Sequence, residues 1–300
     1  MRVLALKVDV DTWMGTRDGV PRLAELFTSL GCPATFLFSL GPDHTGRAVR
    51  RIFRPGFLGK VGRTSVVSNY GIRTLLYGTL LPGPQIGVRA CDQMRDVQRG
   101  GFEVGVHAYD HVEWQDRVET ASETWTRQQM GKACEVFGRV FERAPTIHGS
   151  AGWQVNAHVP LLEETFGFRF ASDTRGDQPF LPAGGGVPQL PTTLPTLDEL
   201  IGRQDLRATP VDALLELTRA DAEHGHVYTL HAELEGGAYL TDFRRLLLGW
   251  REQGYTLASL GDMFARLDIA GLPRRHIVQG TVAGRSGTLA CIGARDIGST

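Results

Sequence analysis

Seven short apolar runs, rich in β-branched residues, recur along the 300-residue chain. Each stops close to a polar residue or a glycine, which is typical of strands bounded by turns. The runs span Val3 to Val10, Ala34 to Leu40, Phe102 to Val106, Thr146 to His148, Phe168 to Ala171, Val227 to Leu230 and Tyr255 to Leu257. We therefore expect about seven strands.

Helical patterns separate most of these runs. Trp125 to Phe141 carries apolar residues close to the 3.6-residue period of a helix. Thr196 to Glu199 has the form of a capping box that opens another helix. Further helices are expected at Val20 to Leu30, Pro210 to Ala222 and Tyr239 to Trp250. Strands that alternate with helices predict a parallel sheet, either in an incomplete (β/α) barrel or in a doubly wound sheet.

Two segments lack a strand or helix pattern. Gln178 to Pro195 is rich in proline and glycine, and we expect a long ordered loop near the functional site. From Pro273 onward the chain is Gly-rich with no clear helix. A chain of this length suggests two domains, but α/β barrels of this size often form one. We expect a single domain over residues 1–272 and a tail over residues 273–300.

Titratable residues lie at the ends of four of the predicted strands. They are Asp9 and Asp11, His107 and His111, Asp173 and Arg175, and His231. In a parallel α/β barrel these carboxyl ends meet at the active-site face. Two carboxylates two residues apart on an extended chain also project to the same face. The joint occurrence of these residues favours one shared site.

Each of these groups also has a structural explanation when it is taken alone. Asp9 and Asp11 could be capping or loop residues, and two histidines four residues apart are more often a surface pair. Asp173 with Arg175 is commonly an ion pair, and a lone histidine at a strand end is usually a core or loop residue. Ala108 stands where zinc proteases with such a histidine pair carry a glutamate, so that class of site is not indicated.

Taken together, the residue types suit a catalytic metal centre. One carboxylate and two imidazoles leave coordination positions open for water and substrate. A metal held in this way lowers the pKa of bound water and polarises a carbonyl oxygen. A second carboxylate suits a general base, and a histidine on the other side suits an acid for the leaving group. The same ligands accept Zn, Mn, Co or Fe.

Three of these motifs in combination resemble the NodB-homology family of polysaccharide deacetylases (carbohydrate esterase family 4). They are Asp9-Val-Asp11, His107-x-x-x-His111 and Leu230-His231. Further short identities resemble a subfamily of deformylases that act on a lipid-linked formamido sugar. They lie at Asp9 to Thr12, Gly15 to Leu23, Gly41 to Asp43, Ala151 to Trp153, Thr193 to Thr196 and His231 to Glu233. The resemblance covers essentially the whole chain and implies a distorted (β/α)7 barrel of NodB-homology type.

The resemblance also implies roles for individual residues. Asp9 would be the general base and His231 the general acid, with Asp173 as the partner that orients this histidine. The ligands of one divalent metal ion would be Asp11, His107 and His111. Family members often carry an Arg-x-Pro-Tyr motif whose arginine pairs with the base, but His148 to Trp153 contains no arginine. Arg175, on the neighbouring strand, is the candidate replacement.

The reaction implied by the resemblance is hydrolysis of an amide. The formamide of undecaprenyl-phosphate 4-deoxy-4-formamido-L-arabinose would yield formate and the 4-amino sugar lipid. This step belongs to lipid A modification and to resistance against cationic antimicrobial peptides such as polymyxin. The alternatives are a deacetylase of another N-acyl sugar, or a non-catalytic protein that binds the lipid carrier.

A basic segment from His44 to Cys91 contains no aspartate or glutamate. Its basic residues include Arg47, Arg50, Arg51, Arg54, Lys60 and Arg63, and the first four recur at the spacing of one helix face. Aromatic and apolar residues such as Phe57 are interleaved with them. This composition is typical of an interfacial helix pair that faces anionic lipid. We expect a basic amphipathic insertion over residues 44–91 that meets the inner-membrane surface; a solvated basic face is the alternative.

Composition narrows the remaining classes of protein. The chain has 32 lysines and arginines against 33 acidic residues, a balance that argues against a whole-chain nucleic-acid binder. The four cysteines are scattered, without the spacing of a metal knuckle or a disulfide framework. No signal-peptide pattern and no apolar run of membrane-spanning length is present. We expect a cytoplasmic protein, peripheral on the cytoplasmic face of the inner membrane, and we predict no protein partner.

Overall fold

The central strand, β1 (Val3–Val10), is buried along its whole length. The computed structural model describes residues 2–52, 76–201, 203 and 208–295, and side chains are not described for 49–52 and 295. Continuous burial is expected for a central strand of a parallel sheet, since both of its faces are covered. The strand nevertheless carries a lysine, Lys7, and an aspartate, Asp9, whose side chains are both buried.

Six more parallel strands pair around β1. They are β2 (Thr35–Ser39), β3 (Glu103–Ala108), β4 (Ile147–His148), β5 (Phe170–Ala171), β7 (His226–His231) and β8 (Thr256–Ala258). The order is β5-β4-β3-β2-β1-β7, with β8 paired to β1. All seven strands expected from the sequence are confirmed.

The sheet is distorted where β1 changes partner along one edge. The first half of β1 pairs with β8 from Val3 to Ala5, and the second half pairs with β2 from Lys7 to Val10. β7 follows the other edge from Leu4 to Asp9. This arrangement is a distorted (β/α) barrel, so the first of the two fold classes left open by the periodicity is confirmed.

The predicted loop between Gln178 and Pro195 bridges the two outer strands of this path, β5 and β7. Leu190 N–H donates to Ala171 O of β5 at 2.8 Å, and Thr193 N–H donates to Val227 O of β7 at 3.1 Å. These backbone bonds satisfy strand edges that would otherwise lack partners. The loop therefore closes the barrel on the side where strand pairing stops.

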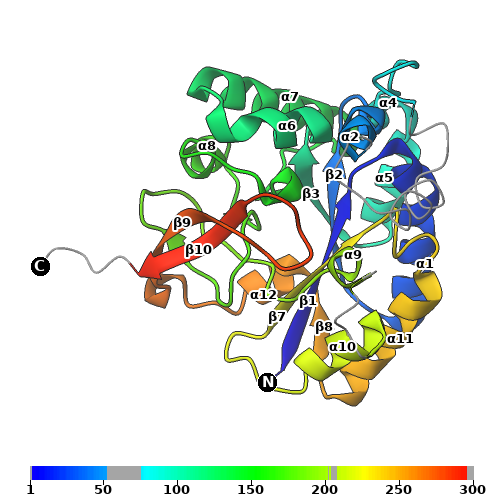
Figure 1. Ribbon diagram of the computed structural model, residues 1–300, viewed down its shortest axis with the longest axis vertical. Helices are drawn as coiled ribbons and strands as arrows, with labels where there is room; N and C mark the ends of the chain where they lie inside the picture. Colours follow the sequence, from blue (N-terminus) through cyan, green and yellow to red (C-terminus); the bar gives the residue numbers. More distant parts are fainter. Residues whose placement is uncertain (1, 53–75, 202, 204–207, 296–300) are drawn as a thin grey trace, which may run out of the picture.

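Helices surround the sheet. The larger ones are α1 (Val20–Leu30), α2 (Thr45–Ile52), α5 (Cys91–Arg99), α7 (Glu123–Phe141), α10 (Pro210–Leu217) and α11 (Leu240–Glu252). The shorter ones are α4 (Ile86–Arg89), α6 (His111–Arg117), α8 (Val159–Thr165), α9 (Leu197–Leu200) and α12 (Leu260–Phe264). Figure 1 shows α7 and α6 above the sheet and α1 and α11 along one side.

The helices expected from the sequence are present, with one shorter than expected. α10 ends at Leu217, although the pattern suggested a helix to Ala222. Gln253 Nε2 donates to Leu215 O and Tyr255 Oη donates to Thr218 O, so side chains satisfy carbonyls at the helix end. The capping box at Thr196 is confirmed at the start of α9.

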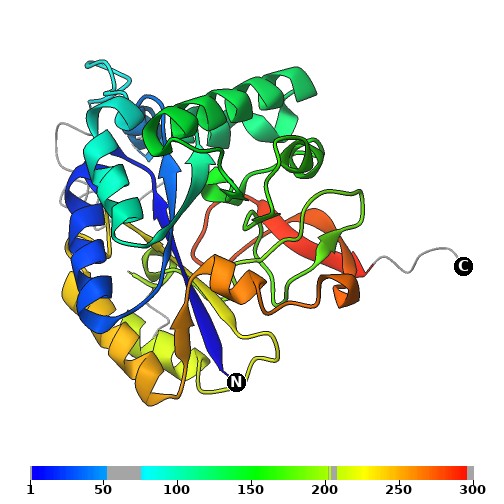
Figure 2. The ribbon, with the colours of Figure 1, turned by 180° about the vertical axis from the view of Figure 1, so that it is seen from behind.

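The carboxyl-terminal segment forms a β hairpin. β9 (Arg274–Gly280) pairs antiparallel with β10 (Leu289–Arg295), and β9 also pairs with the short strand β6 (Leu181–Pro182). In both views the hairpin lies on the side of the sheet away from α1 and α11 (Figures 1 and 2). Arg175 N–H donates to Ala290 O, which attaches the hairpin to the end of the fifth strand. The Gly-rich tail expected from the sequence is thus an ordered part of the barrel mouth up to residue 295.

All four cysteines are free thiols. None of the helices in the described ranges combines the length and hydropathy that a membrane crossing requires.

Candidate active site

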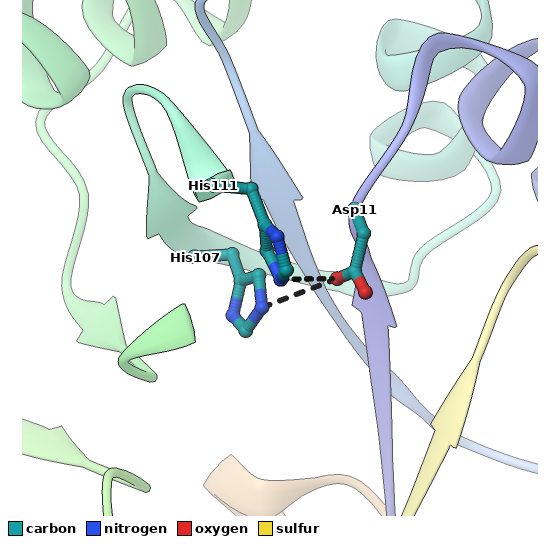
Figure 3. Close-up of side chains that lie close together, drawn as sticks. All are labelled: Asp11, His107 and His111. Atoms are coloured by element: carbon teal, nitrogen blue, oxygen red, sulfur yellow. Dashed lines mark ion pairs between the residues drawn. The ribbon is translucent and has the colours of Figure 1, made fainter. Parts of the chain in front are cut away.

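Asp11, His107 and His111 converge at the carboxyl end of the sheet (Figure 3). Asp11 directly follows β1, His107 lies in β3, and His111 is the first residue of α6. The Nε2 atoms of His107 and His111 lie 3.2 and 3.4 Å from Asp11 Oδ1. We call these three residues the Asp11 cluster.

Neighbouring groups fix the orientation of the two imidazoles. The Nδ1 atom of His107 lies 2.6 Å from Gly149 O, so it carries the proton and donates it to this carbonyl. The Nε2 atom of His107 is then an unprotonated nitrogen that faces Asp11. Asp110 caps α6 by accepting a hydrogen bond from Glu113 N–H at 3.0 Å, which holds the turn that carries His111.

The Asp11 cluster fits a divalent metal ion. Its ligand atoms all lie within 4.8 Å of one another. The Oδ1 atom of Asp11 is buried and accepts no hydrogen bond from the described residues, which is costly for a carboxylate that lacks a cation. Burial acts to raise the pKa of Asp11, but His111 and His107 outweigh it and hold that pKa well below its usual range. An ionised carboxylate and two imidazoles are suitable ligands for Zn, Mn, Co or Fe.

The cation beside Asp9 is Lys7 and not Arg175. Lys7 Nζ lies 3.4 Å from Asp9 Oδ2 and donates to Ser172 O at 2.9 Å. Arg175 instead forms a buried ion pair with Glu199. The suggested replacement of the family arginine by Arg175 is therefore not what the geometry shows.

A simple signal in the sequence identifies Lys7. Because side chains alternate along a strand, Lys7, Asp9 and Asp11 lie on the same face of β1 and its extension. Lys7 interrupts the apolar run from Val3 to Val10 for a single residue, so the run has the pattern of an ordinary buried strand.

His231 ends β7 and lies opposite Asp9 in the register of the sheet. Its Nδ1 atom is 3.5 Å from Asp198 Oδ1. Burial acts to lower the pKa of His231, but the carboxylates of Asp198 and Asp11 outweigh burial and raise the pKa to about 9. The imidazole is therefore protonated at neutral pH, as a general acid must be.

Asp173, which we expected to orient His231, belongs to a second cluster. Its Oδ1 atom lies 3.3 Å from His148 Nδ1, and the same nitrogen lies 2.6 Å from Glu163 Oε1. All three side chains are buried. We call His148, Glu163 and Asp173 the His148 cluster; the carboxylate that faces His231, the candidate acid, is that of Asp198.

Comparison with known proteins identifies the family. The chain is 34% identical over 288 residues to a protein of Shewanella sediminis (strain HAW-EB3), covering 96% of this chain and 93% of that relative. It is 31% identical over 282 residues to a protein of Wigglesworthia glossinidia brevipalpis, covering 92% of this chain and 98% of that relative. Both are described as the 4-deoxy-4-formamido-L-arabinose-phosphoundecaprenol deformylase ArnD. The chain belongs to the ArnD deformylase family. No family model matches the chain.

Solved structures place the fold of this ArnD-family chain among deacetylases. A protein of Mycobacterium smegmatis described as a polysaccharide deacetylase is 18% identical with a TM-score of 0.63, and the match covers 93% of this chain and 94% of that one. A Pseudomonas aeruginosa PAO1 protein described in the same way is 16% identical with a TM-score of 0.55, covering 87% and 89%. The distorted barrel of NodB type is thereby confirmed.

Two glutamates of this ArnD-family chain, for which the sequence suggested no role, support the site from the loop after β7. Glu233 Oε1 accepts hydrogen bonds from Asp11 N–H at 3.0 Å, Thr12 N–H at 2.7 Å and Thr12 Oγ1 at 2.8 Å. A Cβ added at Gly15 would lie 2.0 Å from this oxygen, so only glycine permits the approach. Glu235 Oε2 accepts from the backbone N–H of His231 at 2.9 Å. The two glutamates fix the backbone of a candidate metal ligand and of the candidate acid.

Trp153, in a segment that resembles the ArnD family, has a strained backbone inside the site. Its φ of 54° lies in the left-handed region, which costs a non-glycine residue about 1–2 kcal/mol. Its indole contacts the imidazole of His231 edge-on, with 6.4 Å between ring centroids. Three cations also lie over the indole ring, from Lys7, Arg175 and Arg285. Arg285, on the carboxyl-terminal hairpin, was not anticipated from the sequence.

Residues 53–75, nearly half of the expected basic insertion of this family member, lie outside the described residues. Arg54, Phe57, Lys60 and Arg63 fall there, and only the backbone is described for Arg50 and Arg51. Arg47, in α2, is exposed and its Nε donates to Gly78 O at 2.9 Å. The expected helix at the start of the insertion is present as α2.

Proposed function

We propose that this protein hydrolyses the formamide of undecaprenyl-phosphate 4-deoxy-4-formamido-L-arabinose, releasing formate and the 4-amino sugar lipid. The observation that carries the proposal is the convergence of Asp9, the Asp11 cluster and His231 at one end of the sheet. A base, three ligands and an acid in a member of the ArnD family are the groups that amide hydrolysis requires.

Asp9 is suited to accept the proton of the attacking water. Its Oδ1 atom is buried without a hydrogen bond from the described residues and lies 3.8 Å from Nδ1 of His107, whose other ring nitrogen faces Asp11. Lys7 Nζ lies 3.4 Å from the other carboxylate oxygen, so its positive charge faces the Asp9 carboxylate. The water oxygen adds to the formyl carbon while Asp9 takes one of its protons.

His231 completes the reaction from the opposite side. The carbon–nitrogen bond breaks and the nitrogen takes a proton from the imidazolium, so that the sugar leaves as an amine. Asp198 holds this imidazole through Nδ1, which leaves Nε2 as the proton donor. A divalent ion held by the Asp11 cluster would polarise the formyl carbonyl and lower the pKa of the attacking water.

The product explains the proposed place of this reaction in lipid A modification. Hydrolysis converts a neutral formamide into an amine that is protonated at neutral pH. A lipid A that carries this sugar is less anionic and binds cationic peptides such as polymyxin less well. This biological role follows from the proposed substrate.

The direct test is release of formate from synthetic polyprenyl-phosphate formamido-arabinose. We expect formate in equimolar amount with free amine, loss of turnover after chelation, and recovery on addition of one of Zn²⁺, Mn²⁺, Co²⁺ or Fe²⁺. The matched acetamido sugar distinguishes the deacetylase alternative, since that enzyme would release acetate at a comparable rate. Absence of turnover with every metal would instead favour a lipid-carrier-binding protein.

We also propose that the face around the basic insertion meets an anionic membrane surface. At its described edge Leu80 is 76% exposed and Val88 is 68% exposed, and Arg47, whose Nε donates to Gly78 O, is exposed as well. Apolar side chains next to basic residues are typical of interfacial binding. The lipid-linked substrate makes such binding necessary.

Vesicle sedimentation tests this surface. Replacing Leu80 and Val88 by Ser, or Arg47, Arg50, Arg51 and Arg54 by Ala, should weaken binding to vesicles that contain anionic lipid. The matched control is Leu161→Ser, an exposed leucine on α8 outside the insertion. Unchanged binding in both sets of variants would contradict the proposal.

A further inference from the structure

The tip of the carboxyl-terminal hairpin returns to the site. Gly284 lies so close to α9 that an added Cβ would lie 2.4 Å from Glu199 O, and the φ angle of Gly284 is +88°. Only glycine permits both the contact and the backbone conformation. The next residue, Arg285, is thereby directed at the carboxylates of α9.

The Asp198 carboxylate lies between Arg285 and the candidate acid, His231. Its Nε donates to Glu199 Oε1 at 3.0 Å, and its Nη2 lies 3.3 Å from Asp198 Oδ2. The other oxygen of Asp198 faces His231. The Nη2 atom is buried and makes no hydrogen bond of good geometry within the described residues. The guanidinium therefore retains donor capacity at the site.

Of the three cations around Trp153, Arg285 is the most accessible. Its side chain is 23% exposed, against 9% for Arg175 and 0% for Lys7. Lys7 is occupied by Asp9 and Ser172 O, and Arg175 is bound to Glu199 and Leu194 O. A ligand that enters from solvent thus meets Arg285 before the other two cations.

The proposed substrate is an anion that must enter a site rich in carboxylates. Asp9, Asp11, Asp198 and Glu199 all lie at this end of the barrel. Without a compensating cation they would repel the phosphate, which lies one sugar ring away from the formamide. A guanidinium matches phosphate oxygens in geometry as well as charge.

We propose that Arg285 binds the phosphate of the lipid-linked sugar and so selects phosphate-linked over neutral glycosides. This inference rests on the proposed function and adds the residue that recognises the substrate class. The hairpin then has a role in specificity: it supplies a cation that the barrel strands do not expose.

The test compares two substrates across a set of variants. One substrate is formamido-arabinose linked through phosphate to a short prenyl chain, and the other is the neutral alkyl glycoside of the same sugar. We expect Arg285→Gln to lower kcat/KM for the phosphate-linked substrate about 10- to 100-fold, mainly through KM. The neutral glycoside should lose much less kcat/KM than the phosphate-linked substrate, so the preference between the two falls, and Arg285→Lys should retain part of the preference.

The control is Arg275→Gln, an arginine of the same hairpin whose Nε donates to Gly293 O; it should leave both substrates unaffected. An equal loss on both substrates in Arg285→Gln would mean that Arg285 acts only through Asp198 and His231, and would overturn the proposal. Thermal melting identifies a variant that fails to fold, and Arg285→Lys then carries the comparison.

Binding of geranyl phosphate, measured by calorimetry, is independent of turnover. The Kd of the wild-type protein for geranyl phosphate should be lower than that of Arg285→Gln by about tenfold or more. Equal binding would overturn the proposal even if no substrate is turned over. If geranyl phosphate binding depends on Arg285 but no substrate is turned over, the result would contradict only the proposed deformylase reaction.

Discussion

The Asp11 cluster and the His148 cluster contain the same residue types at similar distances, yet they differ in what surrounds them. Each brings histidine and carboxylate atoms within 4.8 Å of one another. In the His148 cluster every carboxylate oxygen has a protein donor: Gln189 Nε2 donates to Glu163 and Asp173, and Ser150 N–H donates to Asp173. In the Asp11 cluster Asp11 Oδ1 has no donor among the residues that the structure describes.

This difference shows that distance alone does not define a metal site. An amide NH2 group directed at two carboxylates occupies the positions that a cation would need. A proton on His148 supplies the positive charge in that cluster. Burial acts to lower the pKa of His148, but Asp173 and Glu163 outweigh burial and raise this pKa to about 10. The His148 cluster is therefore complete without a metal ion, and the Asp11 cluster is not.

Of the variants considered, Asp11→Asn should show the difference between the Asp11 cluster and the His148 cluster most strongly. Loss of the charged ligand should abolish stoichiometric metal binding and lower kcat/KM about 10³-fold or more, because proton transfer and charge stabilisation fail together. Metal content by mass spectrometry and formate release measure the two effects. The control Asp92→Asn, on the exposed face of α5, should change neither. A variant that keeps one equivalent of metal would contradict the assignment of Asp11.

Asp173→Asn should have the opposite pattern. Breaking a buried ion pair should cost about 3–5 kcal/mol in the free energy of unfolding, with metal content unchanged. Since the pKa of His148 is raised in the folded state, its contribution is complete below the unfolded-state pKa of about 6.5. It is lost as the pH rises through about 10. Urea denaturation from pH 6 to 10 should show this loss in wild type and a weaker one in the variant; loss of bound metal from a folded variant would refute the distinction.

Glu233→Ala should weaken the Asp11 cluster without removing a ligand. The backbone of Asp11 and Thr12 loses the acceptor for its hydrogen bonds, and we expect metal affinity to fall about 10- to 100-fold. Glu233→Gln retains one acceptor oxygen, so its metal affinity should lie between that of wild type and that of Glu233→Ala. Calorimetric titration with Mn²⁺ or Zn²⁺ measures both, with Glu135→Ala on the outside of α7 as the control. Unchanged affinity in Glu233→Ala would show that the loop is held by other contacts.

Asp198→Asn should give the smallest effect, a displacement in pH. The Asp198 carboxylate helps to raise the pKa of His231 to about 9, so its removal lowers this pKa. The protonated acid is then lost at a lower pH, and the alkaline limb of kcat/KM should move in that direction. Asp173→Asn should leave this limb in place. The reverse result would restore Asp173 as the partner of the acid.

Strands were predictable from the sequence because each is a local apolar run, and the Asp11 cluster was predictable because its members end such runs. Asp198 and Arg285 were not, since they reach His231 from a short helix and a hairpin tip that are far apart along the chain. Asp173 was assigned to the wrong histidine because proximity in strand order does not say which way a side chain turns. The membrane-facing role of the insertion over residues 44–91 stays a prediction, and residues 53–75 lie outside the described residues.

The lysine in β1 has a consequence for how the protein matures. Lys7 and Asp9 form an ion pair within a strand that is buried along its whole length, so folding does not leave the Asp9 carboxylate as an uncompensated charge. Asp11 lies at the more open end, and its Oδ1 atom accepts no hydrogen bond from the described residues. We therefore expect the barrel to assemble before metal enters, which makes metal loading a late step that a folded apo-protein can undergo repeatedly.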